Sequence, residues 1–426
     1  MFTVLKKIWS TNTWQQRLIF WMGAVFIGIF ISLMTKLSEW AGDTFVIFFR
    51  QYPELVFLIA PLGMGLTRWL TYFFFPNCEG SGVPQVKIAL EINDDLDKRY
   101  QFLSLKMILG KMLLPIMGLF SGASVGFGGP AIQVGASVMT LLGKTVKSPA
   151  HYMEKGLILA GSAAGFAAMF SAPLAGIIFA IEEMGRSLEA RISSLVLTTI
   201  ILAGITAYAL LDSHTYFNSR DLLMPWGKAW LAVPLCGIVG GVMGGVFSRV
   251  ILTAAILVKR NKESVVLVAM VCGFYIATLA YITDGETLGT GYQQTKQILE
   301  GDTSMQPMYP FLRMLTVVVT AISGIPSGIF VPSISVGAGL GLDLAQWFPI
   351  APMSAMILLT ITAYFSGMLQ SPITAFVMVM EISDSHGIMF ALMASALIAS
   401  ATSHLINPVP LYRALCNNIQ NVNSSR

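Results

Sequence analysis

Two glycine-rich segments with closely similar sequences lie far apart in the chain, and each leads into an apolar stretch. The first is SGASVGFGGPAIQVGA at residues 121–136, and the second is SGIPSGIFVPSISVGA at residues 323–338. A constant offset aligns Ser121 with Ser323, Gly122 with Gly324, Gly126 with Gly328, Pro130 with Pro332, Val134 with Val336 and Gly135 with Gly337. The chain is therefore predicted to contain an internal duplication.

A second pair of segments extends the repeat. After a small change of offset, SAPLAGIIFAIEEM aligns with QSPITAFVMVMEIS, which pairs Pro173 with Pro372 and Glu182 with Glu381. Segments broken by glycine and proline at corresponding places in two apolar halves are typical of a transport site.

The composition of the chain identifies its class. Hydrophobic residues make up 55% and charged residues 11%, whereas soluble domains carry about 25% charge. The apolar runs are 18–37, 56–75, 107–120, 192–211, 230–258, 265–282, 312–322, 354–365 and 390–406. A bilayer core needs roughly 20 helical residues, so the shorter runs predict broken or re-entrant helices hidden from lipid. We predict an all-α integral membrane protein.

The basic residues predict an orientation. They cluster before the first apolar run and in one short loop: Lys6, Lys7 and Arg17, then Lys259, Arg260 and Lys262. The positive-inside rule places both clusters in the cytoplasm. We expect a multi-pass protein in the lipid bilayer with both termini cytoplasmic. The net charge of +4 and the lack of a long basic stretch predict no nucleic-acid partner.

Other chemistries find little support in the sequence. The four histidines are scattered, the four cysteines have no metal-like spacing, and the hydrolase and phosphate-loop motifs do not occur. We predict no metal, no cofactor and no enzymatic activity. Cys78, Cys236, Cys272 and Cys416 are interpreted as small apolar residues. The string GAGLGL at 337–342 and the Gly161–Gly165 spacing predict close helix packing.

The glycine-rich segments themselves can bind an anion. A helix that begins inside the membrane presents unpaired N–H groups and the positive end of its dipole. Several such partial charges can replace an anion's water and still allow the anion to leave, which suits conduction better than a full charge. The other interpretation is that these glycines only permit tight packing.

Several of these motifs together resemble the CLC family of voltage-gated-type chloride channels and chloride/proton antiporters. GSGVP at 80–84 is similar to the family's first anion-binding signature, and GFGGP at 126–130 stands where the family has GREGP. GIFVP at 328–332 matches GxFxP, and Tyr412 in PVPLY resembles the pore tyrosine. The segment 171–184 also matches, so the resemblance covers most of the chain.

This resemblance implies an inverted-repeat fold with broken helices and a homodimer in which each subunit has its own pathway. Chloride would be the transported ligand. The implied anion-binding residues are Ser81 and Tyr412 through their hydroxyls, Ile329 and Phe330 through their N–H groups, and Gly126, Phe127, Gly128 and Gly129 at an outer site.

One departure from the family pattern changes the expected mechanism. The family's central glutamate, which gates the outer site and couples protons to chloride, is Gly128 here, and the neighbouring arginine is Phe127. Glu183 matches the inner proton-transfer glutamate and is a possible remnant of a proton path. The other interpretation is that Glu182 or Glu183 caps or pairs at a helix end. Glu381 is expected to face the cytoplasm or a loop.

The predicted organisation has a first half at 1–211, a linker at 212–228, a second half at 229–412 and a short tail at 413–426. The family's paired nucleotide-binding modules are not expected after so short a tail. We therefore expect a compact prokaryotic member in the plasma (cell inner) membrane.

The sequence thus predicts passive chloride transport, by a channel or an uncoupled uniporter. The main alternative is a chloride/proton antiporter in which another acid replaces the missing gate. A fluoride exporter fits the GSGVP signature less well. A membrane subunit without transport activity is a further alternative.

Overall fold

The computed structural model describes residues 11–92, 95–145, 151–185, 193–211, 217, 222–260, 265–306 and 308–424. Lys6, Lys7 and Lys262, on which the predicted orientation partly rests, lie outside the described residues, as does most of the predicted linker. The described chain forms helices and loops, and its only β-type pairings are two isolated bridges. The all-α prediction is confirmed.

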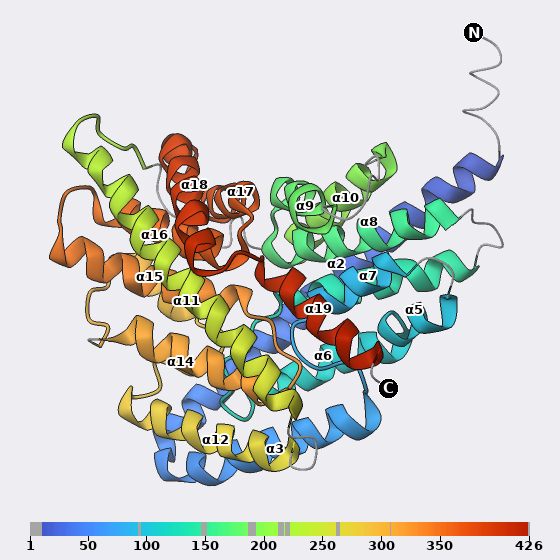
Figure 1. The fold of residues 1–426 in the computed structure, drawn as a ribbon, viewed down its shortest axis with the longest axis horizontal. Coiled ribbons are helices and arrows are strands. Elements are labelled where there is room, and N and C mark those ends of the chain that lie inside the picture. Colours follow the sequence, from blue (N-terminus) through green and yellow to red (C-terminus); the bar gives the residue numbers. More distant parts are fainter. Residues whose placement is uncertain are drawn as a thin grey trace.

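The main helices follow one another along the chain with many breaks (Figure 1). They are α2 (Thr11–Gln51), α3 (Val56–Phe74), α4 (Val83–Glu91), α5 (Leu96–Phe102), α6 (Leu105–Leu119), α7 (Gly128–Thr145), α8 (His151–Phe170), α9 (Pro173–Phe179), α10 (Ser194–Leu211), α11 (Ala232–Arg260), α12 (Val265–Ile282), α13 (Tyr292–Leu299), α14 (Tyr309–Ile322), α15 (Phe330–Trp347), α16 (Met353–Leu369), α17 (Pro372–Ser383), α18 (Met389–Ile406) and α19 (Leu411–Ser424).

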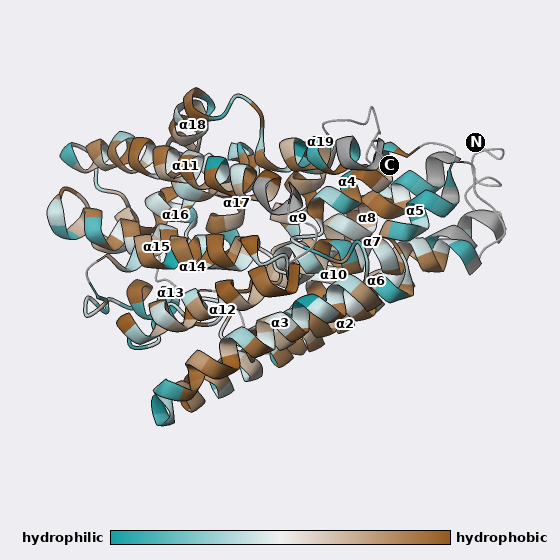
Figure 2. Cartoon of the chain, turned by 60° about the horizontal axis from the view of Figure 1, so that its bottom comes forward, coloured by the Kyte–Doolittle hydropathy of each residue, from teal (hydrophilic) through white to brown (hydrophobic). Residues whose placement is uncertain are grey.

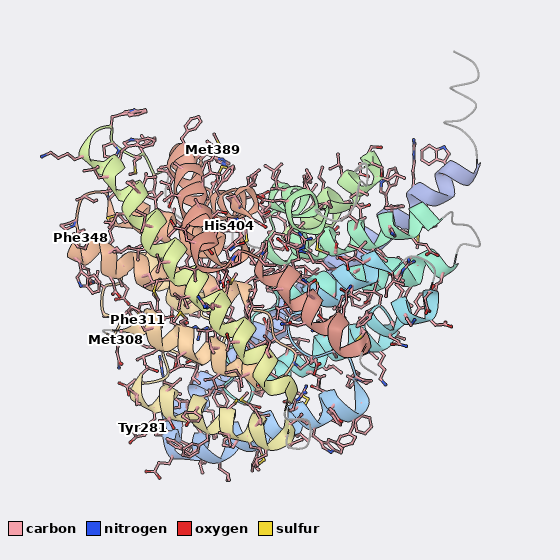
Figure 3. The ribbon with its side chains drawn as sticks, in the orientation of Figure 1. Tyr281, Met308, Phe311, Phe348, Met389 and His404 are labelled. Atoms are coloured by element: carbon pink, nitrogen blue, oxygen red, sulfur yellow. The ribbon has the colours of Figure 1, made fainter. Side chains whose placement is uncertain are left out.

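Much of the outer surface is apolar, as lipid contact requires. Seven stretches of the described chain are long and apolar enough to cross a membrane, whereas α14, α16 and α17 are apolar but shorter. Figure 2 shows apolar residues along α2 and α3, where many leucines are exposed. Tyr281, Phe311 and Phe348 are exposed at the periphery (Figure 3). The predicted mixture of spanning helices and short, broken helices is confirmed.

Corresponding helices occupy corresponding places. In the first part of the chain, α8 contacts α2, α7 and α10; in the second, α16 contacts α11, α15 and α18 in the same way. α7 also contacts α15, and α9 contacts α17, so equivalent elements meet in the interior. This arrangement confirms the inverted-repeat fold. It also brings the starts of the two glycine-rich helices, Gly128 of α7 and Phe330 of α15, to one place in the interior, which we call the junction.

Glycines bring α7 and α8 into backbone contact. A Cβ at Gly135 would lie 2.1 Å from the carbonyl oxygen of Gly161, and a Cβ at Gly165 would lie 2.2 Å from that of Ala131. The prediction that Gly161 and Gly165 allow close packing is confirmed. Such contact between small residues holds membrane helices together by van der Waals packing.

We expect Gly161→Ala to destabilise the protein by about 1–3 kcal/mol, the usual effect of overpacking. The added Cβ would lie 2.3 Å from the Gly135 carbonyl oxygen and would force α7 and α8 apart. Gly156→Ala in the same helix is the control, because its Cβ would meet nothing within 4 Å. Melting temperatures in detergent measure both effects, and equal values for the two variants would contradict the predicted packing role.

Candidate functional site

The loop before α4 holds Ser81 in a fixed position. Gly80 and Gly82 have φ angles of 67° and 99°, a left-handed conformation that favours glycine. The Gly80 N–H donates to the carbonyl of Ile325, and the Ser327 N–H donates to the carbonyl of Gly80. The first signature loop is therefore joined directly to the second glycine-rich segment.

A buried lysine supports the same loop. Lys111, on α6, is fully buried, and its Nζ donates to the Gly80 carbonyl oxygen at 2.6 Å. The sequence analysis missed this residue. An isolated lysine inside the apolar run 107–120 is the signal that could have identified it, because intramembrane charges are costly and generally functional.

The two glycine-rich segments are paired with each other. The Gly126 N–H donates to the Gly328 carbonyl at 2.9 Å, and the Gly328 N–H donates to the Gly126 carbonyl at 2.7 Å. α7 begins two residues after the first of these glycines, and α15 two residues after the second. The reciprocal pair therefore fixes the starts of α7 and α15 against each other, and their first-turn N–H groups have no intrahelical acceptors.

The start of α7 also lies against Ser81 and Phe330. A Cβ at Gly129 would be 2.2 Å from Ser81 Oγ, and a Cβ at Gly128 would be 2.5 Å from Phe330 Cδ2. Any other residue at either position would displace these neighbours. Close approach thus explains why glycine is favoured at both positions.

Tyr412, near the C-terminal end of the chain, lies against Ser81 and Phe330. Its ring is buried at the start of α19, and its hydroxyl lies 3.4 Å from Ser81 Oγ. The Phe330 ring meets the Tyr412 ring edge to face, with 5.9 Å between centroids. The structure therefore brings together residues that the sequence analysis predicted in three separate motifs.

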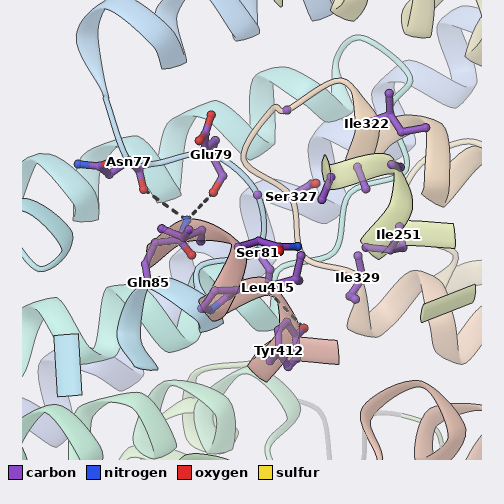
Figure 4. A pocket seen from close by; sticks show the side chains of 18 of the residues that line it. Asn77, Glu79, Ser81, Gln85, Ile251, Ile322, Ser327, Ile329, Tyr412 and Leu415 are labelled. Carbon is purple, nitrogen blue, oxygen red and sulfur yellow. Dashed lines mark hydrogen bonds between the residues drawn. The ribbon is translucent and has the colours of Figure 1, made fainter. Parts of the chain in front are cut away.

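A cavity of about 310 Å³ ends at this group. Ser81, Ile329 and Tyr412 line it, together with side chains from α3, α4, α11 and α19 (Figure 4). Gln85 donates from the wall of the cavity to the carbonyl of Glu79 at 2.7 Å. Ile251, Ala254 and Ala255, toward the C-terminal end of α11, also line the cavity.

Phenylalanine rings fill the space on the other side of Gly128. The Phe330 ring packs against Phe365, Phe166 and Phe170 at centroid distances of 5.4, 5.9 and 6.5 Å. Phe127 is also buried. The sequence analysis considered only the backbone of Phe330, because motif spacing gives no information on where a ring points.

Glu183 lies in a buried ion pair. It belongs to a π-helical turn, Ala180–Met184, that continues α9, and such turns are frequent at functional sites. Its carboxylate accepts hydrogen bonds from Lys87 Nζ and from Ser371 Oγ, the latter at 2.6 Å. The carboxylate side chain is fully buried. Pairing, one of the roles considered for this glutamate, is therefore what the structure shows.

Glu182 and Glu381 cap helices reciprocally. Glu182 accepts from the N–H groups of Ile373 and Thr374 at the start of α17. Glu381 accepts from Leu174 and Ala175 at the start of α9. The two residues aligned by the repeat thus play equivalent roles, and the capping role considered for Glu182 is seen.

Within the described part of the chain, there is no group of three histidine, cysteine or acidic residues that could hold a metal. All four cysteines are buried as free thiols, in agreement with their interpretation as small apolar residues. The polar features at the junction are therefore hydroxyls, backbone groups and single charges.

Comparison with known proteins gives consistent matches over most of the chain. Residues 57–404 match the family model described as voltage gated chloride channel. The H(+)/Cl(-) exchange transporter ClcA of Yersinia pestis is 28% identical over 389 residues, covering 86% of this chain and 79% of that protein. ClcA of Cronobacter sakazakii is also 28% identical, covering 85% of this chain and 80% of that protein.

Solved structures show the same fold at lower sequence identity. The crystal structure of a slow cyanobacterial Cl−/H+ antiporter has a TM-score of 0.79 and 22% identity, with 95% of this chain and 97% of that chain covered. A CLC-type fluoride/proton antiporter has a TM-score of 0.75 and 20% identity, with 94% and 97% covered.

We expect Lys87→Met to destabilise the protein by about 3–5 kcal/mol, because it leaves the buried Glu183 carboxylate without its cation. The double variant Lys87→Met/Glu183→Leu should recover most of this loss, since it removes both charges. Denaturation in detergent measures the effect.

The control is Lys98→Met, which breaks an exposed ion pair with Asp95 and should change little. A double variant as unstable as Lys87→Met alone would show that the lysine acts through packing instead of charge.

Proposed function

This chain belongs to the voltage gated chloride channel family, and we propose on that basis that it carries chloride or a similar small anion passively across the membrane. The single observation that supports this most is the meeting of Ser81, Tyr412 and the starts of α7 and α15 at the end of a cavity. The two predicted halves, 1–211 and 229–412, would together form one pathway.

The proposed central site uses partial charges. The hydroxyls of Ser81 and Tyr412 would donate to the anion, and the N–H groups of Ile329 and Phe330 would point at it from the start of α15. The positive ends of two helix dipoles add a favourable potential. Because each contribution is small, the anion can bind and leave again. Gly126, Phe127, Gly128 and Gly129 would line the outer part of the route.

We further propose that transport is not coupled to protons. Gly128 offers no carboxylate at the position where the family has its gating glutamate, and the Phe330 ring occupies the adjacent space. Glu183 already accepts hydrogen bonds from Lys87 and Ser371. A proton relay through Glu183 would have to break this buried ion pair and would find no acid at position 128.

Chloride/proton exchange is the second candidate. It is favoured by the relatives, which are named exchange transporters, and by the retention of the buried Glu183. Exchange would require another acidic residue to replace the missing gate. Proton movement distinguishes the two candidates directly.

We also propose a homodimer formed through the outer faces of α9 and α17. Leu174 and Ile373 are exposed there, and the half-buried carboxylate of Glu182 caps α17 beside them. A charge facing lipid hydrocarbon is costly, so a second copy of the chain is the favoured covering. An inner-membrane location with both termini in the cytoplasm completes the proposal.

Flux in liposomes tests the function. With opposed chloride and pH gradients, we expect the reversal potential to equal the chloride equilibrium potential, with no net proton movement. A reversal potential that shifts with the pH gradient, together with uphill proton flux, would instead establish exchange. Protein-free liposomes prepared in parallel measure the leak.

A matched pair of variants tests the role of position 128. We expect both Gly128→Ala and Gly128→Glu to slow chloride flux, because either Cβ displaces the Phe330 ring. Only the chloride flux through Gly128→Glu should depend on pH. The ionised carboxylate of the new glutamate competes with the anion, and protonation removes its charge. The flux through this variant should therefore rise as pH falls. Unchanged flux in both variants would mean that this position lies off the pathway.

A further inference from the structure

Among the residues that the structure describes, a single basic side chain lines the cavity that leads to Ser81 and Tyr412. Of the described residues around this cavity, Arg68 is the only basic one and Glu79 the only acidic one. Arg68 lies on the buried face of α3, and its side chain is 6% exposed. An arginine keeps its charge under all ordinary conditions, so a permanent cation faces this space.

Only one of the three guanidinium nitrogens of Arg68 donates hydrogen bonds to protein groups of the described chain. Its Nη1 donates to Glu79 Oε2 at 2.9 Å and to the Gly324 carbonyl oxygen at 2.7 Å. Nη2 and Nε have no acceptor among the described residues, neither atom is fully buried, and Arg68 lines the cavity. A nearly buried cation with unused donors beside an open space is suited to bind an anion.

Glu79 forms an ion pair with Arg68 and is the more exposed of the two side chains. Its side chain is 50% exposed, against 6% for Arg68, so water screens the carboxylate better than the guanidinium. An anion entering the cavity would compete with Glu79 for the same cation. The ion pair therefore weakens anion binding at Arg68 without abolishing it, which is what a transit site needs.

We propose that Arg68 forms an additional binding site for a small monovalent anion within the cavity, and that Glu79 tunes its affinity. The anion occupies this site before it reaches the hydroxyls of Ser81 and Tyr412. This inference rests on the proposed transport function for its biological role, but binding at Arg68 can be tested without any flux.

Two substitutions with opposite expected effects test the site. Arg68→Gln should raise the chloride concentration for half-maximal flux about tenfold, the cost of one charged hydrogen bond. Glu79→Gln should lower it roughly threefold, because it removes a partly screened competitor. Arg68→Lys keeps the charge and should lie between Arg68→Gln and the unmodified protein. Arg249→Gln is the control, since Arg249 is an exposed cation on α11 outside the cavity.

Bromide provides a direct readout of binding. In crystals grown with bromide, we expect an anomalous peak beside the Arg68 guanidinium that is lost in Arg68→Gln and stronger in Glu79→Gln. The Glu79 variant retains the bond from Arg68 to Gly324, so it remains informative if Arg68→Gln fails to fold.

A bromide peak near Ser81 and Tyr412 with none at Arg68 would overturn this inference and leave the proposed function intact. Equal weakening of flux by both substitutions would also overturn it, because that result indicates a purely structural ion pair. A peak at Arg68 in a protein without anion flux would support the site while rejecting the proposed transport.

Discussion

Every helix that ends inside a membrane leaves backbone groups that lipid cannot satisfy, and this requirement shapes the centre of the molecule. The reciprocal hydrogen bonds between Gly126 and Gly328 pair two of these groups and align α7 with α15. Each glycine-rich segment therefore satisfies a backbone N–H and a backbone carbonyl of the other, so the fold depends on both copies of the repeat. The first-turn N–H groups of α7 and α15 are the ones that would contact the anion in the proposed function.

Buried cations stabilise the loops between the broken helices. Lys111 binds the Gly80 carbonyl, and Arg68 binds the Gly324 carbonyl. Arg313 is fully buried and donates to three successive carbonyls, those of Thr287, Leu288 and Gly289. Each of these hydrogen bonds satisfies a loop carbonyl with a cation, and the bonds to Gly80 and Gly324 do so in loops that line the cavity. These residues thus connect the stability of the loops to the electrostatics of the site.

Much of this arrangement could be predicted from the sequence, but only part of the site could. The repeat placed Ser121 and Ser323 in corresponding segments, and motif matching identified Ser81 and Tyr412, which lie 331 residues apart. The ion pair of Lys87 with Glu183 and the contact of Arg68 with Gly324 leave no local pattern, since their partners are 96 and 256 residues away. Such contacts depend on helix crossings, which periodicity and composition do not determine.

This chain has glycine at position 128 but keeps Glu183. The reason is that removing one member of a buried ion pair is strongly destabilising. Losing the carboxylate alone would leave the Lys87 ammonium, whose side chain is 12% exposed, without its partner in the protein interior. A glycine at position 128 carries no such penalty, because the Phe330 ring fills the neighbouring space. The outer carboxylate can therefore be lost in one substitution, whereas the inner one is held by its pair. The presence of Glu183 is therefore explained by the stability of the folded protein. Whether proton movement is coupled to chloride is better judged from the residue at position 128.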